Sequence, residues 1–319
     1  MGGNPDNYSA GSVCGPGKKR RYPAGVCQAL SNKKKNMTRL QSGDLAEISA
    51  RLNAYDEELL AKTRRTLRGL ACYAVGLDEE AIAAGLADVQ IGVVPVRWGQ
   101  GVIEGFSETT RDILKHLGFQ TFLTDNPNVS GLAEALEKCA DIIFLSDDDH
   151  FAALNVKCRR TVENAEATGK GYAAGLDLMA GGLQGQATLV IGCGPVGTSA
   201  AMTLANYGAK VSVYDIDHSR SRRLADTLGR TLNHKVAIES DLIRAVSKYR
   251  FLVEATDSAG IIGAKDLAPD ACIAAPGMPP GLSRAAARKV SARLLHDPLQ
   301  IGVATMGLAA LQQILSRLR

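Results

Sequence analysis

Apolar residues along the chain recur with two periods, one helical and one strand-like, which alternate from residue 42 onward. Leu45, Ile48, Leu52 and Leu60 recur at helical spacing and predict one long helix from Ser42 to about residue 70. A second, short helix is predicted over 79–87. Short apolar runs then predict strands over 89–96, 121–123 and 142–145, separated by helices over 106–117 and 132–139 with cap candidates at Ser107 and Ser130. Alternation of this kind predicts a small parallel sheet with right-handed crossovers.

The second half of the chain continues the alternation over a longer stretch. A helix is predicted over 161–180, followed by strand-like runs near 187–191, 210–214, 235–238, 251–255, 271–275 and 293–295. Six such runs separated by helical segments predict a doubly wound parallel sheet. A last helix over 303–318 lies beyond that sheet, and we expect it to pack back on the first domain.

A glycine-rich turn lies at the centre of this second pattern. Strand residues Ala187–Ile191 run into Gly192, Gly194 and Gly197, and a helix follows. In dinucleotide-binding proteins the first glycine makes a tight turn, the second lets the backbone approach a pyrophosphate, and the third permits close helix packing. Asp215 ends the next strand, where a carboxylate accepts hydrogen bonds from a ribose 2′-hydroxyl and repels a 2′-phosphate. The pattern predicts a Rossmann domain that binds NAD in preference to NADP.

Further cofactor contacts are expected from residues beside this turn and at the ends of neighbouring strands. The complete predicted set for the cofactor is Gly192, Gly194, Pro195, Val196, Gly197, Asp215, Ile216, Ala255, Thr256, Pro276 and Gly277. Pro276 and Gly277 end the fifth strand of the predicted sheet, so we expect them to shape the nicotinamide edge of the cleft.

Carboxylates gather at the predicted strand ends of the first domain. Asp147, Asp148 and Asp149 follow its third strand, which suits them to bind ammonium groups, although aspartates in the first turn of a helix are an equal alternative. Asp125 precedes a proline-containing turn and Asp297 follows the last strand of the second sheet, so each is either a turn residue or a site carboxylate. No histidine has a matched partner in the sequence, so none is assigned as a base.

Composition and charge narrow the class of protein. With 45% apolar and 22% charged residues the chain has a globular composition, and it shows neither a membrane-length apolar run nor a signal-peptide core. The seven cysteines form no CxxC pair, so we expect reduced thiols, no metal site and a cytoplasmic location. We expect no membrane or nucleic-acid partner, and the sequence allows a homodimer.

The net charge of +4 is unevenly distributed. Residues 1–36 carry seven basic side chains against Asp6 alone, a net charge of +6, which leaves −2 for the rest of the chain. This leader is rich in Gly, Asn, Ser and Pro and has no apolar period, which predicts a disordered, solvated tail or an extension ahead of a start at Met37. A nucleic-acid-binding arm is the alternative. We therefore divide the chain into a leader (1–36), a substrate domain (37–168), an NAD-binding domain (169–301) and a C-terminal helix (302–319).

Several runs together resemble one family, the dehydrogenases of pyrrolysine biosynthesis (the PylD family). The resemblance extends from Met37 to about Met306, and the runs that carry it are Leu40; Gly92–Val96 with Phe106–Glu108; Thr124-Asp125 and Val129–Gly131; Asp147-Asp148 with Phe151 and Asn155; the glycine-rich turn; Tyr214-Asp215; Glu254–Thr256; Pro276-Gly277; and Pro298-Leu299 with Ala304–Met306. The first-domain runs make the resemblance specific because they are not general features of Rossmann domains.

The resemblance implies a substrate and roles for individual residues. The family oxidises the terminal amine of 3-methylornithyl-lysine with NAD, and the product loses that nitrogen and closes a pyrroline ring. It implies Asp147 and Asp297 as catalytic residues, with Asp147 binding the amine. The substrate-binding set it implies is Leu40, Arg97, Trp98, Asp125, Asp147, Asp148, Asn155 and Asp297. Arg97 and Trp98 stand where the family has small hydroxyl residues, and Asp297 stands in place of glutamate.

Two other functions are compatible with the residues themselves. One is another two-domain NAD-dependent dehydrogenase that acts on an amino acid or a hydroxy acid. The other is a non-catalytic NAD-binding or amine-binding protein, since a Rossmann fold alone does not fix a function.

Overall fold

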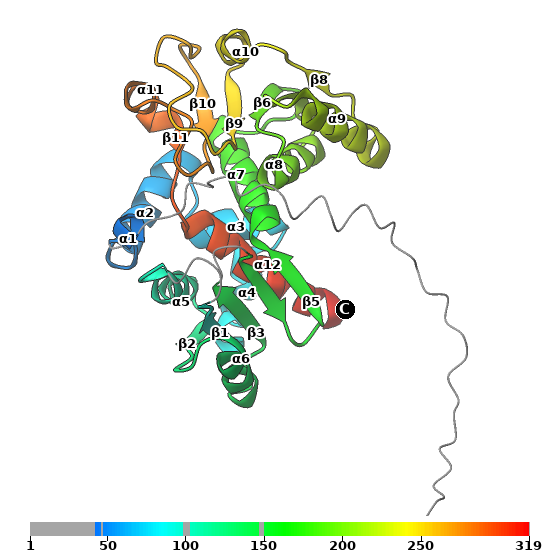
Figure 1. Ribbon diagram of the computed structural model, residues 1–319. Helices are drawn as coiled ribbons and strands as arrows, with labels where there is room; N and C mark the ends of the chain where they lie inside the picture. The colour runs from blue at the N-terminus through cyan, green and yellow to red at the C-terminus, as the bar shows by residue number, and fades with distance from the viewer. Residues whose placement is uncertain (1–41, 46, 98–102, 147–149, 319) are drawn as a thin grey trace, which may run out of the picture. The chain divides into compact units, whose positions relative to one another are not determined.

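The computed structural model describes residues 42–45, 47–97, 103–146 and 150–318, all of which belong to the compact unit of residues 38–319. Two sheets form its framework (Figure 1). The strands are β1 (Gln90–Pro95), β2 (Gln120–Leu123), β3 (Ile142–Ser146), β4 (Ala152–Asn155), β5 (Arg160–Glu163), β6 (Ala187–Ile191), β7 (Lys210–Tyr214), β8 (Ala237–Ile238), β9 (Phe251–Glu254), β10 (Cys272–Ala274) and β11 (Leu294–Leu295).

Helices flank and connect the two sheets. The helices are α1 (Ser42–Leu45), α2 (Ile48–Thr63), α3 (Leu67–Val75), α4 (Glu79–Ala83), α5 (Phe106–His116), α6 (Asn128–Glu137), α7 (Asn164–Ala180), α8 (Pro195–Asn206), α9 (His218–Leu232), α10 (Leu242–Lys248), α11 (Arg284–Lys289) and α12 (Gln300–Leu318), with short 3-10 turns at Leu86–Asp88 and Ser291–Arg293. The predicted α/β class is confirmed.

The first sheet has the strand order β2-β1-β3-β4-β5. Its first three strands are parallel, as predicted, but β4 and β5 form an antiparallel hairpin that the sequence analysis missed. The predicted helix over 161–180 is wrong at its start because residues 160–163 form β5. The helix considered as an alternative setting for the acidic triplet is not found either, because the residues that follow the triplet form β4. Short strands of this kind carry too few residues for the apolar period to identify them.

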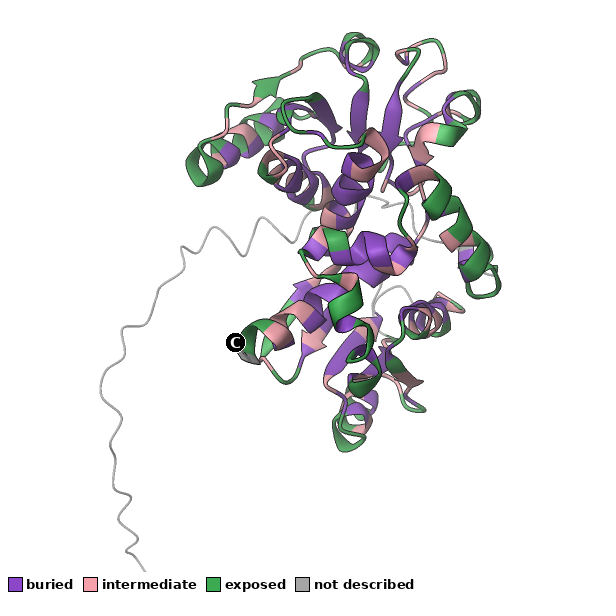
Figure 2. Ribbon diagram, turned by 180° about the vertical axis from the view of Figure 1, so that it is seen from behind, coloured by how far each residue is buried: buried purple, intermediate pink, exposed green. Residues whose placement is uncertain are grey.

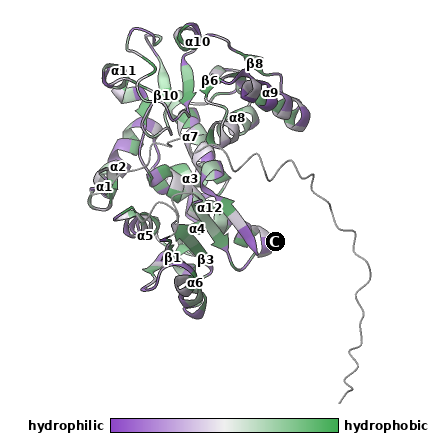
Figure 3. Ribbon diagram, in the orientation of Figure 1, coloured by the Kyte–Doolittle hydropathy of each residue, from purple (hydrophilic) through white to green (hydrophobic). Residues whose placement is uncertain are grey.

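The second sheet has the order β11-β10-β9-β6-β7-β8, and all its pairs are parallel. This is the doubly wound order of a Rossmann domain, which confirms the predicted fold class. Its central strands β6 and β9 are buried because helices cover both faces, so their sequences are almost continuously apolar. Figure 2 shows these central strands in the colour of buried residues, and Figure 3 shows them as strongly hydrophobic.

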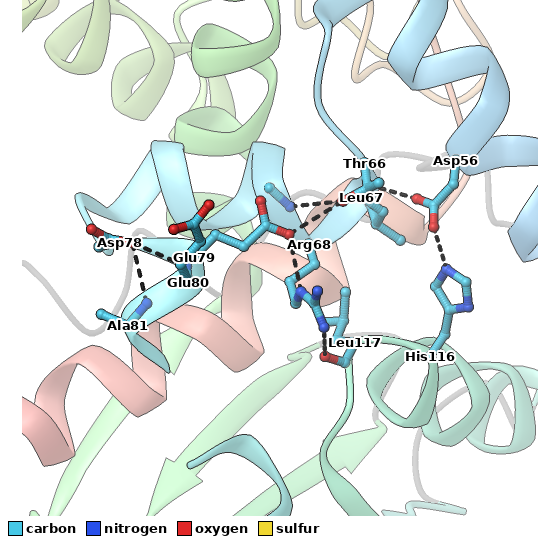
Figure 4. Close-up of polar contacts among 11 residues, drawn as sticks. Asp56, Thr66, Leu67, Arg68, Asp78, Glu79, Glu80, Ala81, His116 and Leu117 are labelled. Carbon is cyan, nitrogen blue, oxygen red and sulfur yellow. Dashed lines mark hydrogen bonds and ion pairs between the residues drawn. The ribbon is translucent and has the colours of Figure 1, made fainter. Parts of the chain in front are cut away.

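The predicted long first helix is interrupted. Helix α2 ends where Arg64 adopts a left-handed φ of 60°, and α3 begins after Thr66, whose side chain accepts a hydrogen bond from Gly69 N. Asp56 Oδ1 accepts the N–H of Leu67, and Asp56 Oδ2 lies 2.8 Å from Nε2 of His116 on α5 (Figure 4). The apolar spacing continues through the break, so only the cap chemistry and these tertiary bonds place it.

Helix α7 packs closely against α12 and contacts strands of both sheets, whereas α12 contacts β4 and β5 of the first sheet. A Cβ on Gly171 would lie 2.5 Å from Ile301 of α12, and a Cβ on Gly175 would lie 2.2 Å from Leu295 of β11. Buried apolar residues of α12, including Val303, Met306 and Leu308, complete this core. Helix α12 contacts α3, α5, β4 and β5 of the N-terminal part as well as α7. The domain boundary at 168/169 lies within α7, and the proposed division of the chain stays a prediction.

Candidate cofactor and substrate site

The glycine-rich turn connects β6 to α8 with the backbone geometry that its three glycines allow. Gly192 has φ +92°, and a Cβ on it would lie 2.5 Å from the carbonyl oxygen of Ala255. A Cβ on Gly197 would lie 1.8 Å from the carbonyl oxygen of Gly192, whereas a Cβ on Gly194 would meet nothing within 4 Å. Gly192 and Gly197 are therefore needed by the fold itself, and Gly194 borders open space.

The start of α8 fits the diphosphate of a dinucleotide cofactor. Pro195 occupies the first turn, and no side chain caps the helix at Gly194. Such a start presents backbone N–H groups and the positive end of the helix dipole, both of which favour an anion. The open space beside Gly194 lets a ligand approach these groups, so the residues present fit the predicted cofactor.

Asp215 follows β7 and joins the glycine-rich turn directly. It is 6% exposed; its Oδ2 accepts the N–H of Cys193 at 2.7 Å, and its Oδ1 accepts the N–H of Asp217 at 2.8 Å. A carboxylate offers about four acceptor positions, so two stay available to ribose hydroxyls. The next residue, Ile216, is 88% exposed and offers an apolar surface beside that position.

Glu254 is a buried carboxylate at the end of β9 that our predicted set did not include. It accepts hydrogen bonds from Thr256 N at 2.9 Å, from the Thr256 hydroxyl and from Gly281 N at 2.7 Å. Burial raises the pKa of Glu254, and these hydrogen bonds oppose the rise. A Cβ on Gly277 would lie 2.3 Å from the carbonyl oxygen of Thr256, so the ends of β9 and β10 are in close contact. The signal for Glu254 in the sequence was a charged residue closing the apolar run of β9.

Asp297 lies at the junction of β11, α12 and α2. Its Oδ1 accepts the N–H groups of Leu299 and Ile301 at 3.0 and 3.3 Å, which ties it to the start of α12. Its Oδ2 accepts the hydroxyl of Tyr55 on α2 at 2.7 Å. The hydroxyl of Tyr172 on α7 donates to the Asp297 carbonyl at 2.8 Å and accepts the Asp297 N–H at 2.9 Å. Three helices therefore fix the position of this one residue.

His296 connects Asp297 to the predicted nicotinamide edge. Its Nδ1 lies 2.7 Å from the carbonyl oxygen of Ala275, the residue before Pro276. Burial raises the pKa of Asp297, while the hydrogen bond from Tyr55 and the nearby His296 act in the opposite direction. Neither Tyr55 nor Tyr172 was in the predicted site. Each occurs within a helix, where a tyrosine gives no signal of its own, and only the tertiary fold brings both to Asp297.

At the first sheet, the parallel strands β1, β2 and β3 end at the same edge. Arg97 is exposed, and its N–H donates to Asn128 Oδ1 at 2.7 Å. Asp125 is exposed in a turn whose N–H groups donate to Glu134, at 3.0 Å from Asp125 and at 3.1 Å from Asn126. The turn alternative for Asp125 thus has structural support, and its side chain stays open to solvent.

Asn155 does not belong to this edge. The strand β4 runs antiparallel to β3, so its last residue lies at the opposite end, where Asn155 pairs in register with Ile142 at the start of β3. The amide of Asn155 donates to the Ala310 carbonyl at 2.8 Å and accepts the Cys158 N–H at 3.0 Å. We therefore correct its expected role from substrate binding to anchoring α12.

Four predicted site residues, Leu40, Trp98, Asp147 and Asp148, lie outside the described residues. The acidic triplet directly follows Ser146, the last residue of β3. Within the described residues, no group of three or more His, Cys, Asp or Glu side chains is placed to hold a metal ion, and no helix there is long and apolar enough to cross a membrane.

The doubly wound sheet and its glycine-rich turn are those of a Rossmann domain. With the family matches that follow, they define the class of protein, a dehydrogenase that uses a nicotinamide cofactor. Residues 161–266 match the model of the alanine dehydrogenase/PNT C-terminal domain. Residues 44–162 match the model of the N-terminal domain of the pyrrolysine biosynthesis protein PylD. The chain belongs to the PylD family, because it is 31% identical over 272 residues to a pyrrolysine synthase of Methanosarcina acetivorans.

That alignment covers 85% of this chain and 98% of the relative. A pyrrolysine synthase of Methanosarcina barkeri is also 31% identical, over 85% of this chain and 97% of its own length. Among solved structures, quinate dehydrogenase from Corynebacterium glutamicum in complex with NAD aligns with a TM-score of 0.48 and 14% identity over 72% of this chain and 99% of its own.

Proposed function

We propose that the chain is the dehydrogenase of the last step of pyrrolysine biosynthesis. In this proposal it oxidises the terminal amine of 3-methylornithyl-lysine, and the product closes to pyrrolysine. The observation that carries the proposal is the alignment with two pyrrolysine synthases along nearly their whole length, together with an intact dinucleotide turn in the fold. The match to the PylD N-terminal domain supports the substrate, because the Rossmann half alone is shared by many dehydrogenases.

We further propose NAD as the cofactor. Asp215 is buried at the end of β7, and a 2′-phosphate brought there would face its negative charge. When bound, the nicotinamide accepts a hydride from the substrate carbon. The residues proposed to hold the cofactor are Gly192, Gly194, Pro195, Val196, Gly197, Asp215, Ile216, Ala255, Thr256, Pro276 and Gly277.

The charge of the substrate accounts for the acidic residues. Three amines and one carboxylate give it a charge of about +2 near neutral pH. We propose that Asp147 and Asp148 bind its ammonium groups, with Asp125 open to solvent at the neighbouring strand end and Arg97 at the end of β1. Leu40 and Trp98 complete the proposed substrate set, and Asp297 is proposed as a second catalytic carboxylate.

The oxidation needs a neutral amine. Carboxylates favour the ammonium form and raise its pKa, whereas the hydride can leave only the carbon of a neutral amine. One carboxylate must therefore take a proton from the nitrogen before the C–H bond breaks. The nitrogen lone pair then forms the C=N bond, a second amine of the same molecule attacks that carbon, and the original nitrogen leaves as ammonia.

Incubation of the purified chain with NAD and synthetic 3-methylornithyl-lysine tests the proposal. We expect NADH absorbance together with a product of the mass of pyrrolysine. NADH formed only with other amino acids or hydroxy acids would indicate a different dehydrogenase. Binding of NAD or of the dipeptide without turnover would indicate a binding protein.

A further inference from the structure

The carboxylate of Asp297 has a distinctive set of partners. Oδ1 is occupied by two backbone N–H groups, and Oδ2 accepts only the Tyr55 hydroxyl among the described residues. Since a carboxylate offers about four acceptor positions, one position on Oδ2 remains. Asp297 is 5% exposed, so water has little access to that position. Such a carboxylate is held in place by its partners and retains one acceptor position for a further donor.

Its place in the fold puts Asp297 at the same edge of the sheet as the proposed nicotinamide site. Asp297 follows β11, and the neighbouring His296 is bonded to the Ala275 carbonyl at the end of β10. The carboxyl ends of β9 and β10 lie beside the glycine-rich turn, and in doubly wound sheets the ligand binds at this edge. An ammonium group of the substrate is the donor that such a buried anion attracts.

We propose that Tyr55 is a positioning residue for the oxidation: its hydroxyl holds Asp297 Oδ2 in place, so that this carboxylate receives the proton that the substrate ammonium must lose. The inference rests on the proposed function. In the step, the N–H bond of R–CH₂–NH₃⁺ breaks, its electron pair stays on nitrogen, and the proton forms an O–H bond on Asp297. The products are the neutral amine and a neutral carboxylic acid, and no redox change occurs in this step.

The environment suits a proton acceptor. Burial raises the pKa of Asp297 above that of an ordinary aspartate, which makes the carboxylate a better base. The titratable groups that face it are Tyr55 from α2, Tyr172 from α7 and the adjacent His296. Burial raises the pKa of both tyrosines well above the usual value, so they stay neutral donors. The Tyr55 hydrogen bond lowers the pKa of Asp297, so its removal raises that pKa further and leaves less of the carboxylate ionised at a given pH.

The test compares Tyr55→Phe with a matched control. Tyr73→Phe removes a hydroxyl that donates to Asp177 Oδ2, also at 2.7 Å, in a pair that links α3 to α7 outside the site. In Tyr55→Phe we expect kcat/KM for the dipeptide to fall about tenfold on the acid side of the pH profile. Its acid limb shifts to higher pH, and the rate approaches that of the wild type at alkaline pH, where the substrate amine is already neutral. The dissociation constant for NAD, measured by calorimetry, stays unchanged.

Asp297→Asn provides the second arm. We expect its defect also to disappear at alkaline pH, and Tyr55→Phe to add no further loss in the Asp297→Asn background because both act through one carboxylate. Tyr73→Phe should keep the wild-type pH profile.

Three results for Tyr55→Phe would overturn the proposal. They are an acid limb at the wild-type pH, a loss of kcat/KM that is equal at all pH values, and failure of the variant to fold. A wild-type protein that does not oxidise the dipeptide overturns the proposed function itself. If the wild type oxidises the dipeptide and Tyr55→Phe has the same pH profile as the wild type, only this inference is overturned.

Discussion

Gly194 and Gly197 lie in the same turn, but we expect alanine substitutions at the two positions to affect different properties. The substitution at Gly197 should affect folding stability, and the substitution at Gly194 should affect cofactor binding. At Gly197 an added methyl group would lie 1.8 Å from the carbonyl oxygen of Gly192, a backbone atom that cannot rotate away. At Gly194 it would meet nothing within 4 Å, and its φ of −74° and ψ of −173° are accessible to alanine. The variants Gly197→Ala and Gly194→Ala therefore add the same methyl group to the same turn with opposite consequences.

The structure gives the direction and rough size of both effects. Overpacking against a rigid backbone costs about 1–3 kcal/mol or more, which lowers the melting temperature of Gly197→Ala by roughly 2 °C or more. Gly194→Ala should melt within about 1 °C of the wild type, because its new methyl group disturbs no packing and surface changes of this kind are nearly neutral. The same methyl group enters the space proposed for the diphosphate, so we expect NAD affinity to fall about tenfold or more.

Differential scanning fluorimetry without cofactor, together with calorimetric titration of NAD, measures the two effects separately. If the Gly194→Ala variant binds NAD as tightly as the wild type, the assignment of the α8 start as the diphosphate site is refuted. Gly197→Ala with an unchanged melting temperature would refute the packing argument.

Three further predictions concern other parts of the chain. Asp215→Ala should narrow the preference for NAD over NADP by about tenfold or more in titrations with both cofactors, and a wild type that prefers NADP would show that Asp215 was misassigned. Asp147→Asn should lower turnover of the dipeptide by about 10² while leaving NAD affinity nearly unchanged, and a near-wild-type rate would show that Asp147 does not bind the reacting amine. Deletion of residues 1–36 should change neither the melting temperature nor turnover, since that segment has no apolar period to pack, and a large drop in either would contradict this.

The sequence by itself determined the class of fold and the cofactor motif. Strand runs in a fully buried parallel sheet are continuously apolar, and the turn between β6 and α8 requires glycine at fixed spacing, so both features are visible in the order of residues. The family followed from local runs in the same way, and the alignments with pyrrolysine synthases confirm it. Apolar strand runs, the glycine turn and the family runs all depend on residues that are neighbours in the chain, and the sequence shows these neighbours directly.

Only the tertiary structure decided which residues meet across long separations. The break between α2 and α3 depends on Asp56 and His116, which are 60 positions apart, and the apolar period passes through it unchanged. Asn155 was predicted at a substrate edge, but the antiparallel hairpin places it at the far end of the sheet, against α12. Tyr55 contacts Asp297 across 242 positions. No local pattern encodes such pairs, because they form only when packing of whole helices brings the side chains together.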